Sequence, residues 1–215
     1  MSLKFVHPST ILVSGPTGSG KTKFVSKVIH RNMFDKAPRR IIWIYSEWQP
    51  IYDEMKLLRS EIEFVKGLSD SLYEELDPKV RNLVILDDQM SHAGDTKVLS
   101  RLFTEGSHHR NLSIIYIVQN LFDKGKSHRT VSLNAQYIVL FKNPRDKSQI
   151  DTLGRQMFPN QSKFLIDAFD DATKEPYGYL LIDLRPETHE EFRVRTHIFP
   201  SEDTYAYIAD GYKRK

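Results

Sequence analysis

The sequence predicts an α/β fold in which helices cover both faces of a mostly parallel sheet. Short runs rich in branched and aromatic residues alternate with helix-like stretches, and each run is almost entirely apolar. Strands of this kind are buried on both sides, which is typical of a parallel sheet between two helical layers. With 215 residues and 40% hydrophobic content, the chain can bury a sizeable core. We expect one domain over residues 1–215, in which residues 160–215 form a C-terminal extension.

The apolar runs and the stretches between them give the expected elements in order. The central strands are expected at Thr10–Ser14, Ile41–Tyr45, Leu83–Leu86, Ser113–Val118 and Tyr137–Phe141. Helices are expected at Lys21–Asn32, Ile51–Leu58, Lys97–Glu105 and Lys147–Met157. Two further strands, Tyr179–Asp183 and Glu191–Ile198, are expected to extend the sheet or to form an edge pair.

Composition excludes several classes of protein. The sequence has no apolar run near the 18 or so residues that cross a bilayer, and its start lacks the apolar segment of a secretion signal. It contains no cysteine, which excludes disulfides, thiolate metal sites and a cysteine nucleophile. The net charge of +3 is too small to indicate nucleic-acid binding by itself. We therefore expect a soluble protein made inside a cell.

The segment after the first strand has the pattern G-x-x-x-x-G-K-[ST] of a phosphate-binding loop. This phosphate loop consists of Gly15, Pro16, Thr17, Gly18, Ser19, Gly20, Lys21 and Thr22. Glycines at positions 15, 18 and 20 are expected to turn with positive φ and to let backbone N–H groups approach a phosphate. Lys21 is expected to contact the β- and γ-phosphates of ATP, and Thr22 to bind Mg²⁺ while it opens a helix whose N-terminus faces the same anion.

Two polar strand ends are expected to complete the nucleotide site. The run Leu83–Leu86 leads into Asp87 and Asp88. We expect Asp87 to hold Mg²⁺, directly or through water, and Asp88 to orient or activate the attacking water. The next predicted strand ends in Gln119 and Asn120, one of which is expected to sense the γ-phosphate or to position water. For each amide, a hydrogen bond to its own loop is the alternative.

The order of these features resembles the additional-strand class of P-loop ATPases. GTPases fit less well, because Asn143-Pro144-Arg145-Asp146 lacks the spacing of a guanine-reading segment. Several segments narrow the resemblance further: Ile42–Tyr52 with its Trp48-Gln49-Pro50, the pair Asp87-Asp88, Phe103–Asn111, Ile117–Phe122, Asn143–Asp146 and Leu153–Pro159. From about Ile11 to Pro159 the chain is similar to genome-packaging ATPases of the FtsK/HerA superfamily, which occur in large DNA viruses such as poxviruses, in virophages and in Polinton-type transposons.

This resemblance implies a motor that uses ATP and Mg²⁺ to push double-stranded DNA into a capsid. It implies a homo-oligomeric ring, a pentamer or a hexamer, that contacts a capsid or portal-vertex protein and no membrane. An arginine from the adjacent subunit is expected at the γ-phosphate, with Arg110 as the first candidate, followed by Arg101 and Arg155. The protein is expected inside the host cell, in the cytoplasm or nucleus, or associated with the virion.

Basic and aromatic residues suggest further contacts. Lys124, Lys126 and Arg129 are expected to lie in the loop after Asn120, where they would meet DNA phosphates; a solvated surface loop is the alternative. Trp43 and Tyr45 are expected in the core, and Trp48 is a candidate neighbour of adenine.

Two other functions remain open on sequence alone. The phosphate loop also resembles that of nucleotide monophosphate kinases such as guanylate kinase, although we find no dense group of arginines for a kinase lid. A nucleotide-binding scaffold without hydrolysis is the other alternative, which the presence of Lys21, Thr22, Asp87 and Asp88 together disfavours.

Overall fold

The computed structural model describes residues 4–87, 97–122 and 126–209. The strands are β1 (Thr10–Ser14), β2 (Arg40–Tyr45), β3 (Ile62–Lys66), β4 (Asn82–Asp87), β5 (Leu112–Val118), β6 (Tyr137–Phe141), β7 (Tyr179–Asp183), β8 (Val194–Thr196) and β9 (Tyr205–Tyr207). The helices are α1 (Lys21–His30), α2 (Pro50–Leu58), α3 (Leu72–Glu75), α4 (Lys97–Thr104), α5 (Gly106–His109), α6 (Lys126–Asn134), α7 (Ser148–Met157), α8 (Ser162–Ala172) and the 3₁₀ turn η1 (Glu190–Phe192).

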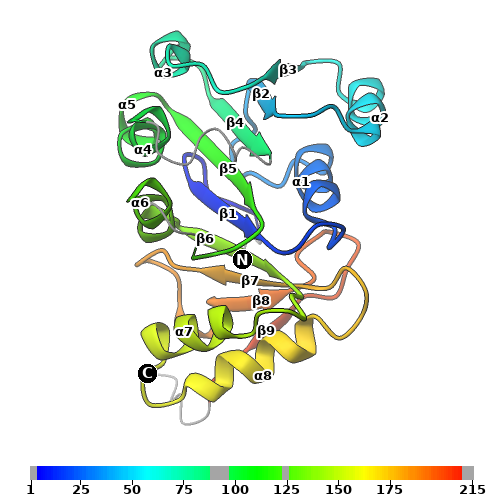
Figure 1. Ribbon diagram of the computed structural model, residues 1–215, viewed down its shortest axis with the longest axis vertical. Helices are drawn as coiled ribbons and strands as arrows, with labels where there is room; N and C mark the ends of the chain where they lie inside the picture. The colour runs from blue at the N-terminus through cyan, green and yellow to red at the C-terminus, as the bar shows by residue number, and fades with distance from the viewer. Residues whose placement is uncertain (1–3, 88–96, 123–125, 210–215) are drawn as a thin grey trace.

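The strands of the described residues form one sheet in the order β3-β2-β4-β5-β1-β6-β7-β8-β9 (Figure 1). Strands β1 to β6 run parallel, and β7 to β9 continue the sheet in antiparallel pairs. The predicted α/β fold with a mostly parallel sheet is therefore confirmed. Strand β5 lies between β1 and β4, so an additional strand separates the phosphate-loop strand from the acid-ending strand.

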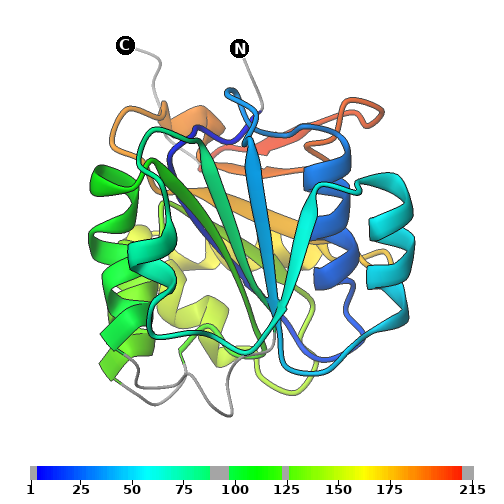
Figure 2. The same cartoon turned by 90° about the horizontal axis from the view of Figure 1, so that it is seen from above.

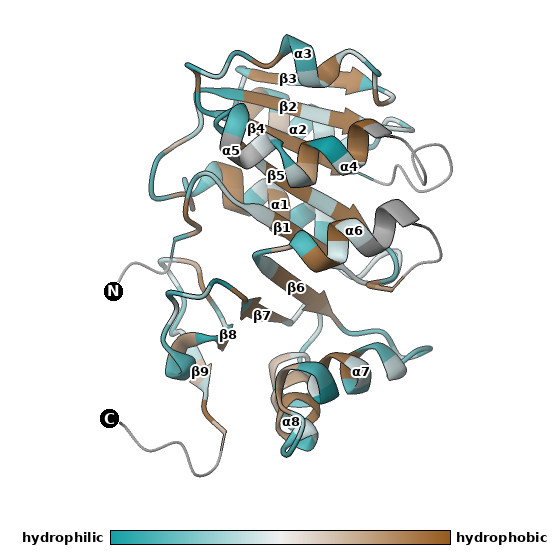
Figure 3. Ribbon diagram, turned by 90° about the vertical axis from the view of Figure 1, so that its left-hand side faces the viewer, coloured by the Kyte–Doolittle hydropathy of each residue, from teal (hydrophilic) through white to brown (hydrophobic). Residues whose placement is uncertain are grey.

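Two helical layers enclose this sheet. Figure 2 shows α1 and α2 on one side of the sheet and α4, α5 and α6 on the other. Each side has its own apolar core: one is built around Phe24, Val28 and Trp43, the other around Leu102, Tyr116 and Leu165. Because the central strands pack against both layers, every residue of β1, β4, β5, β6 and β7 is buried. Figure 3 shows β6 and β7 as hydrophobic along most of their length.

Three parts of the sequence prediction need correction. Strands β3 and β9 and helices α3, α5 and α8 have no counterpart among the predicted elements. Glu191–Ile198 was expected to be one strand, but it divides into η1 and the short strand β8. Lys126 and Arg129, which were expected in a loop, belong to helix α6.

None of the helices in the described residues is both long enough and apolar enough to span a membrane.

Candidate functional site

The parallel strands bring several of the predicted site residues to one edge of the sheet. In the register of the sheet, Asp87 on β4 pairs with Ile117 on β5, and Val118 on β5 pairs with Ser14 on β1. Asp87, Val118 and Ser14 therefore lie at the same edge of the sheet. The Gly15 N–H donates a hydrogen bond of 3.2 Å to the Val118 carbonyl, which fixes the start of the phosphate loop against β5.

The phosphate loop depends on its glycines for two different reasons. Gly18 and Gly20 have φ angles of 79° and 103°, which L side chains rarely adopt. Gly15 is not among the residues with positive φ, so that part of the prediction is wrong. At Gly15 a Cβ would lie 2.7 Å from Cβ of Phe141 and 2.8 Å from Oγ of Ser19. Close packing, not backbone conformation, therefore requires glycine at this position.

Helix α1 begins directly after the loop and presents its N-terminus there. Gly20 is its N-cap and provides no side chain for the N–H groups of the first turn, which also contains no acidic residue. A helix N-terminus in this state carries partial positive charge and unsatisfied donors. An anion such as a phosphate supplies what this end of the helix lacks.

Lys21 adds a full positive charge above the loop. Its Nζ donates hydrogen bonds to the carbonyl oxygens of Gly15 (2.6 Å) and Pro16 (2.9 Å). Lys21 also lines two cavities that open on the loop, so its side chain borders the space that an anion there would occupy.

Asp87 and Thr22 meet across the site. Asp87 is buried, with 3% of its surface exposed, and its Oδ2 accepts hydrogen bonds from Tyr52 Oη at 2.8 Å and from Thr22 Oγ1 at 3.4 Å. Mg²⁺ in nucleotide sites usually takes one or two carboxylates, phosphate oxygens and several waters. A buried carboxylate and a hydroxyl this close together, beside a loop built for phosphate, fit Mg²⁺. Asp88 lies outside the described residues, so its predicted role is not addressed by the structure.

The two amides at the end of β5 have different surroundings. Gln119 is exposed and lines a cavity of about 110 Å³ together with Asp87, Gln49 and residues of the phosphate loop. Asn120 instead accepts a hydrogen bond of 3.3 Å from Gln149 of α7, whose side-chain oxygen also accepts the Leu121 N–H at 2.7 Å. Of the two amides, Gln119 borders this cavity at the phosphate loop, whereas Asn120 takes part in holding its own loop.

A second cavity, of about 320 Å³, begins where the first one ends. Both cavities are lined by Gly18, Lys21, Thr22 and Gln49. The second cavity is also bounded by Lys23 of α1, Pro50 of α2 and Tyr177, which precedes β7. Together the two cavities form a path from Asp87 across the N-terminus of α1.

Three arginines, Arg110, Arg101 and Arg155, were candidates for the contact with the γ-phosphate. Arg110 precedes β5 and is therefore at the opposite edge of the sheet from the phosphate loop. Its guanidinium lies 4.8 Å from the ring centroid of Tyr73, and that of Arg101 lies 4.1 Å from the same centroid. Arg155 forms an ion pair of 3.0 Å with Asp151 on α7. The chain does not bring Arg110 to its own phosphate loop, and a role in a neighbouring subunit stays a prediction.

The predicted DNA contacts are only partly within the described structure. Lys124 lies outside the described residues. Lys126 and Arg129 belong to α6, but their side chains are not described.

Sequence reasoning missed three residues at the site: Tyr52, Gln49 and Tyr177. Tyr52 was given no role at the site; it is fully buried, and its hydroxyl donates a hydrogen bond to Asp87. Trp43 is buried as expected. Trp48, a candidate neighbour of adenine, instead packs on Tyr52 and Phe64 and does not line either cavity.

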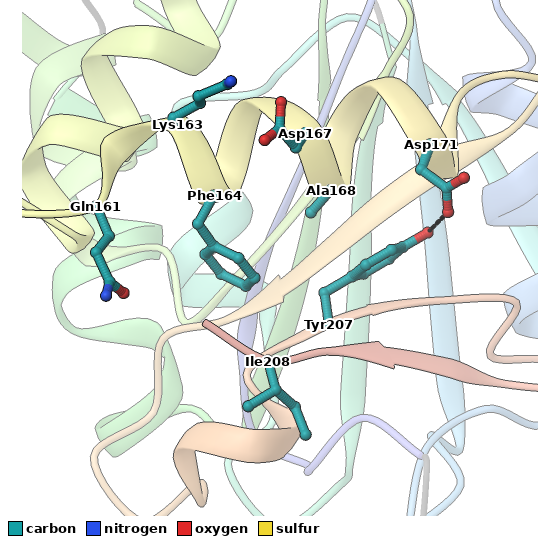
Figure 4. A pocket seen from close by; sticks show the side chains of 8 residues that line it. All are labelled: Gln161, Lys163, Phe164, Asp167, Ala168, Asp171, Tyr207 and Ile208. Carbon is teal, nitrogen blue, oxygen red and sulfur yellow. Dashed lines mark hydrogen bonds between the residues drawn. The ribbon is translucent and has the colours of Figure 1, made fainter. Parts of the chain in front are cut away.

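A larger hollow lies away from the phosphate loop. It measures about 650 Å³ and is bounded by α8 and by Tyr207 and Ile208 at the end of β9 (Figure 4). Tyr207 Oη donates a hydrogen bond of 2.7 Å to Asp171 across it. Its size alone does not make it the functional site, because none of the predicted site residues line it.

Comparison with known proteins finds solved structures with a similar fold. No protein-family model and no curated protein matches the sequence. Among solved structures, the chain is similar to B204, the DNA-packaging ATPase from Sulfolobus turreted icosahedral virus, with a TM-score of 0.61 and 14% identity over 89% of this chain and 98% of that one. The genome-packaging NTPase B204 of Sulfolobus turreted icosahedral virus 2, in complex with ATP-gammaS, gives 0.58 and 15% over 88% and 96%.

A KaiC-like protein from Pyrococcus horikoshii is also similar, with a TM-score of 0.50 and 13% identity over 94% of this chain and 90% of that one. At these identities the likeness concerns the fold. The chain has the fold of a P-loop NTPase.

Proposed function

We propose that this chain is a Mg²⁺-dependent ATPase that drives double-stranded DNA into a viral capsid. One observation carries the ATPase part of the proposal. Lys21, Thr22, Asp87 and Gln119 come from three separate segments of the chain and line one cavity of about 110 Å³. A cation, a hydroxyl, a buried carboxylate and an amide around a phosphate-sized space are the groups that phosphoryl transfer to water requires.

Each group has a role in this reaction. Lys21 and the N–H groups at the start of α1 bind the β- and γ-phosphates. Thr22 and Asp87 hold Mg²⁺, which when bound neutralises charge on those phosphates. Gln119 orients the attacking water against the γ-phosphate, and Asp88 accepts its proton. The buried position of Asp87 keeps its carboxylate in one orientation for this work.

The DNA-packaging part of the proposal draws on two further supports. The structural likeness to the DNA-packaging ATPase B204 extends over nearly the whole length of that protein. Two of the segments that resemble packaging ATPases, Trp48-Gln49-Pro50 and Gln119-Asn120, fall at the edge of the sheet that holds the candidate site. We propose that Lys124, Lys126 and Arg129 contact the DNA backbone by charge, with little reading of bases.

We also propose that the site works between subunits of a homo-oligomeric ring, a pentamer or a hexamer, docked on a capsid or portal-vertex protein. An arginine from the neighbouring copy stabilises charge on the γ-phosphate in the transition state. Arg110 is the first candidate: it precedes β5, at the opposite edge of the sheet from its own phosphate loop, so any contact with ATP would be to ATP on another copy. Mixing Lys21→Ala subunits with Arg110→Ala subunits tests this: hydrolysis reappears in the mixture if each supplies the part that the other lacks.

Phosphate release from ATP, with and without duplex DNA, tests the function directly. The parent protein is expected to hydrolyse ATP faster with DNA and only with Mg²⁺. Lys21→Ala is expected to lose ATP binding, whereas Asp88→Asn is expected to bind ATP and lose hydrolysis. Changing Lys124, Lys126 and Arg129 together to alanine is expected to weaken DNA binding and its salt dependence; unchanged DNA stimulation in that variant would count against the proposed contacts.

The same assay separates the ATPase from a nucleotide monophosphate kinase. With AMP, GMP, CMP and UMP present, an ATPase still releases inorganic phosphate. Transfer of phosphate to one of these nucleotides, with no stimulation by DNA, would contradict the proposed function.

A further inference from the structure

The turn between α8 and β7 holds an exposed tyrosine in a backbone conformation that favours glycine. The Gly178 N–H donates a hydrogen bond of 3.1 Å to the Glu175 carbonyl, which closes a four-residue turn. Tyr177 is the third residue of this turn and has a φ of 65°. With Pro176 before it, this is the position of a type II turn that glycine or asparagine normally occupies. A residue with a β-carbon is strained at this φ, so tyrosine is an unfavourable residue at this position of the turn.

The neighbouring glycine fixes where the tyrosine lies. A Cβ at Gly178 would collide with the carbonyl oxygen of Ala172, at the end of α8. The turn therefore packs tightly against that helix end. The side chain of Tyr177 is nevertheless 68% exposed, so burial of its ring does not offset the strain.

The ring lies beside the phosphate loop. A Cβ built on Gly20 would be 3.1 Å from Cδ1 of Tyr177. Tyr177 also lines the cavity of about 320 Å³ that continues from the cavity of Asp87 and Gln119 and shares Lys21 and Thr22 with it. A nucleoside triphosphate with its γ-phosphate near Asp87 would therefore extend along the N-terminus of α1 toward the ring of Tyr177.

We infer that Tyr177 is the residue that stacks on the base of the bound nucleotide. The inference rests on the proposed nucleotide site and adds to it the place of the base. An exposed aromatic face beside the open end of a phosphate site gives a base a flat apolar surface, and stacking of this kind is tolerant of base identity. Tyr177 therefore strengthens the binding of ATP and GTP alike, and does not contact the reacting phosphate.

Equilibrium binding of ATP, GTP and inorganic tripolyphosphate to the full chain tests this inference. Tyr177→Gly removes the ring and suits the positive φ, so the variant is expected to melt at the same temperature as the parent or higher. Its affinity for ATP and for GTP is expected to fall by roughly ten-fold, the loss of one stacking contact, with no change for tripolyphosphate, which has no base. Tyr177→Phe, which keeps the ring, is expected to bind ATP as the parent does.

Two controls make the result specific. Tyr205 is also an exposed tyrosine, but it lies on β9 against His197, so Tyr205→Ala is expected to leave all three affinities unchanged. Lys21→Ala is expected to lose its affinity for both ATP and tripolyphosphate. Equal ATP affinity in Tyr177→Gly and the parent would overturn the stacking inference and leave the proposed function intact. A parent protein that binds neither ATP nor tripolyphosphate would overturn both.

Discussion

The hydroxyl of Tyr52 donates a hydrogen bond of 2.8 Å to Oδ2 of Asp87, the carboxylate proposed to hold Mg²⁺. Tyr52 lies on α2 and is fully buried, so its ring cannot move away from the acid. The bond orients Asp87 toward Thr22, which approaches the same oxygen from α1. Tyr52 is therefore a positioning residue that acts through Asp87.

Tyr52→Phe is expected to raise the Mg²⁺ concentration that half-saturates ATP hydrolysis by roughly ten-fold, as loss of an outer hydrogen bond to a metal ligand commonly does. The variant keeps the aromatic packing against Trp43 and Phe64, so its unfolding free energy is expected to change by only about 1 kcal/mol. Titration of Mg²⁺ at saturating ATP measures the effect.

Tyr73→Phe is the matched control for this prediction. Tyr73 is also buried, on α3, and lies outside both site cavities. Its variant is expected to show the Mg²⁺ dependence of the parent. If Tyr52→Phe does the same, the hydrogen bond to Asp87 has no role in metal binding.

The sequence predicts the centre of the sheet well because its strands are buried on both faces. Thr10–Ser14, Tyr137–Phe141 and Tyr179–Asp183 were predicted with their observed bounds. Strand β3 at the sheet edge was missed because only Ile62 of its five residues is buried, so Glu63 and Lys66 hide the pattern. Helix α8 was missed although Leu165, Ala168, Phe169 and Ala172 have the spacing of a buried helix face.

The site also contains residues that the sequence predicts and residues that it does not. The phosphate loop and Asp87 could be selected from the sequence because the loop is a local pattern and Asp87 ends a single apolar run. The bond from Tyr52 to Asp87 depends on β2 lying next to β4, and the place of Tyr177 depends on β7 pairing antiparallel with β6. Neither pairing can be derived from the residues concerned.

Gln119 and Asn120 provide a second prediction, because they are adjacent amides with different contacts. Gln119→Ala is expected to lower kcat for ATP by about 100-fold and to change KM little, since it removes a group that orients water only as the reaction proceeds. Asn120→Ala removes one hydrogen bond to Gln149 and is expected to lower kcat by less than about three-fold. Steady-state kinetics of the two variants measure this difference. Similar losses of kcat in both would show that Gln119 has no special role.

Asp183 supports a prediction about stability that is separate from the site. Its carboxylate has no exposed surface and accepts hydrogen bonds from Arg185 at 2.8 Å and from Arg195 at 3.2 Å. Burial lowers the pKa of Arg195, while the charge of Asp183 raises it. Removal of this carboxylate leaves a buried guanidinium without its counter-charge, which typically costs 3–5 kcal/mol.

Asp183→Ala is therefore expected to lower the unfolding free energy by about 3 kcal/mol in urea titrations. Glu187→Ala removes the exposed partner of Arg185 and is expected to cost less than about 0.5 kcal/mol. Equal unfolding midpoints for the two variants would contradict the importance of the buried pair.

His7 gives the stability of the fold a dependence on pH. Its ring is buried in a chain of hydrogen bonds: Nε2 lies 3.0 Å from the Asn111 side-chain oxygen, which accepts, and Nδ1 lies 2.7 Å from Ser113 Oγ, which donates to it when the neutral ring carries its proton on Nε2. Ser113 Oγ in turn accepts the Ser9 N–H at 3.1 Å. This arrangement suits a neutral imidazole, since a proton on Nδ1 would leave Ser113 without its acceptor.

Burial lowers the pKa of His7 below its usual value of about 6.5. The unfolded chain therefore takes up this proton at a higher pH than the folded chain does. The contribution of His7 to stability is complete above the unfolded pKa and is lost as pH falls from there toward the lower folded pKa. The urea concentration at the unfolding midpoint is accordingly expected to decrease as the pH is lowered from 7.5 to 5.5. The decrease is expected to be smaller in a His7→Gln variant. His189→Gln, at an exposed position, controls for the loss of one histidine. If the unfolding midpoint of His7→Gln changes with pH as steeply as that of the parent, other groups cause the pH dependence.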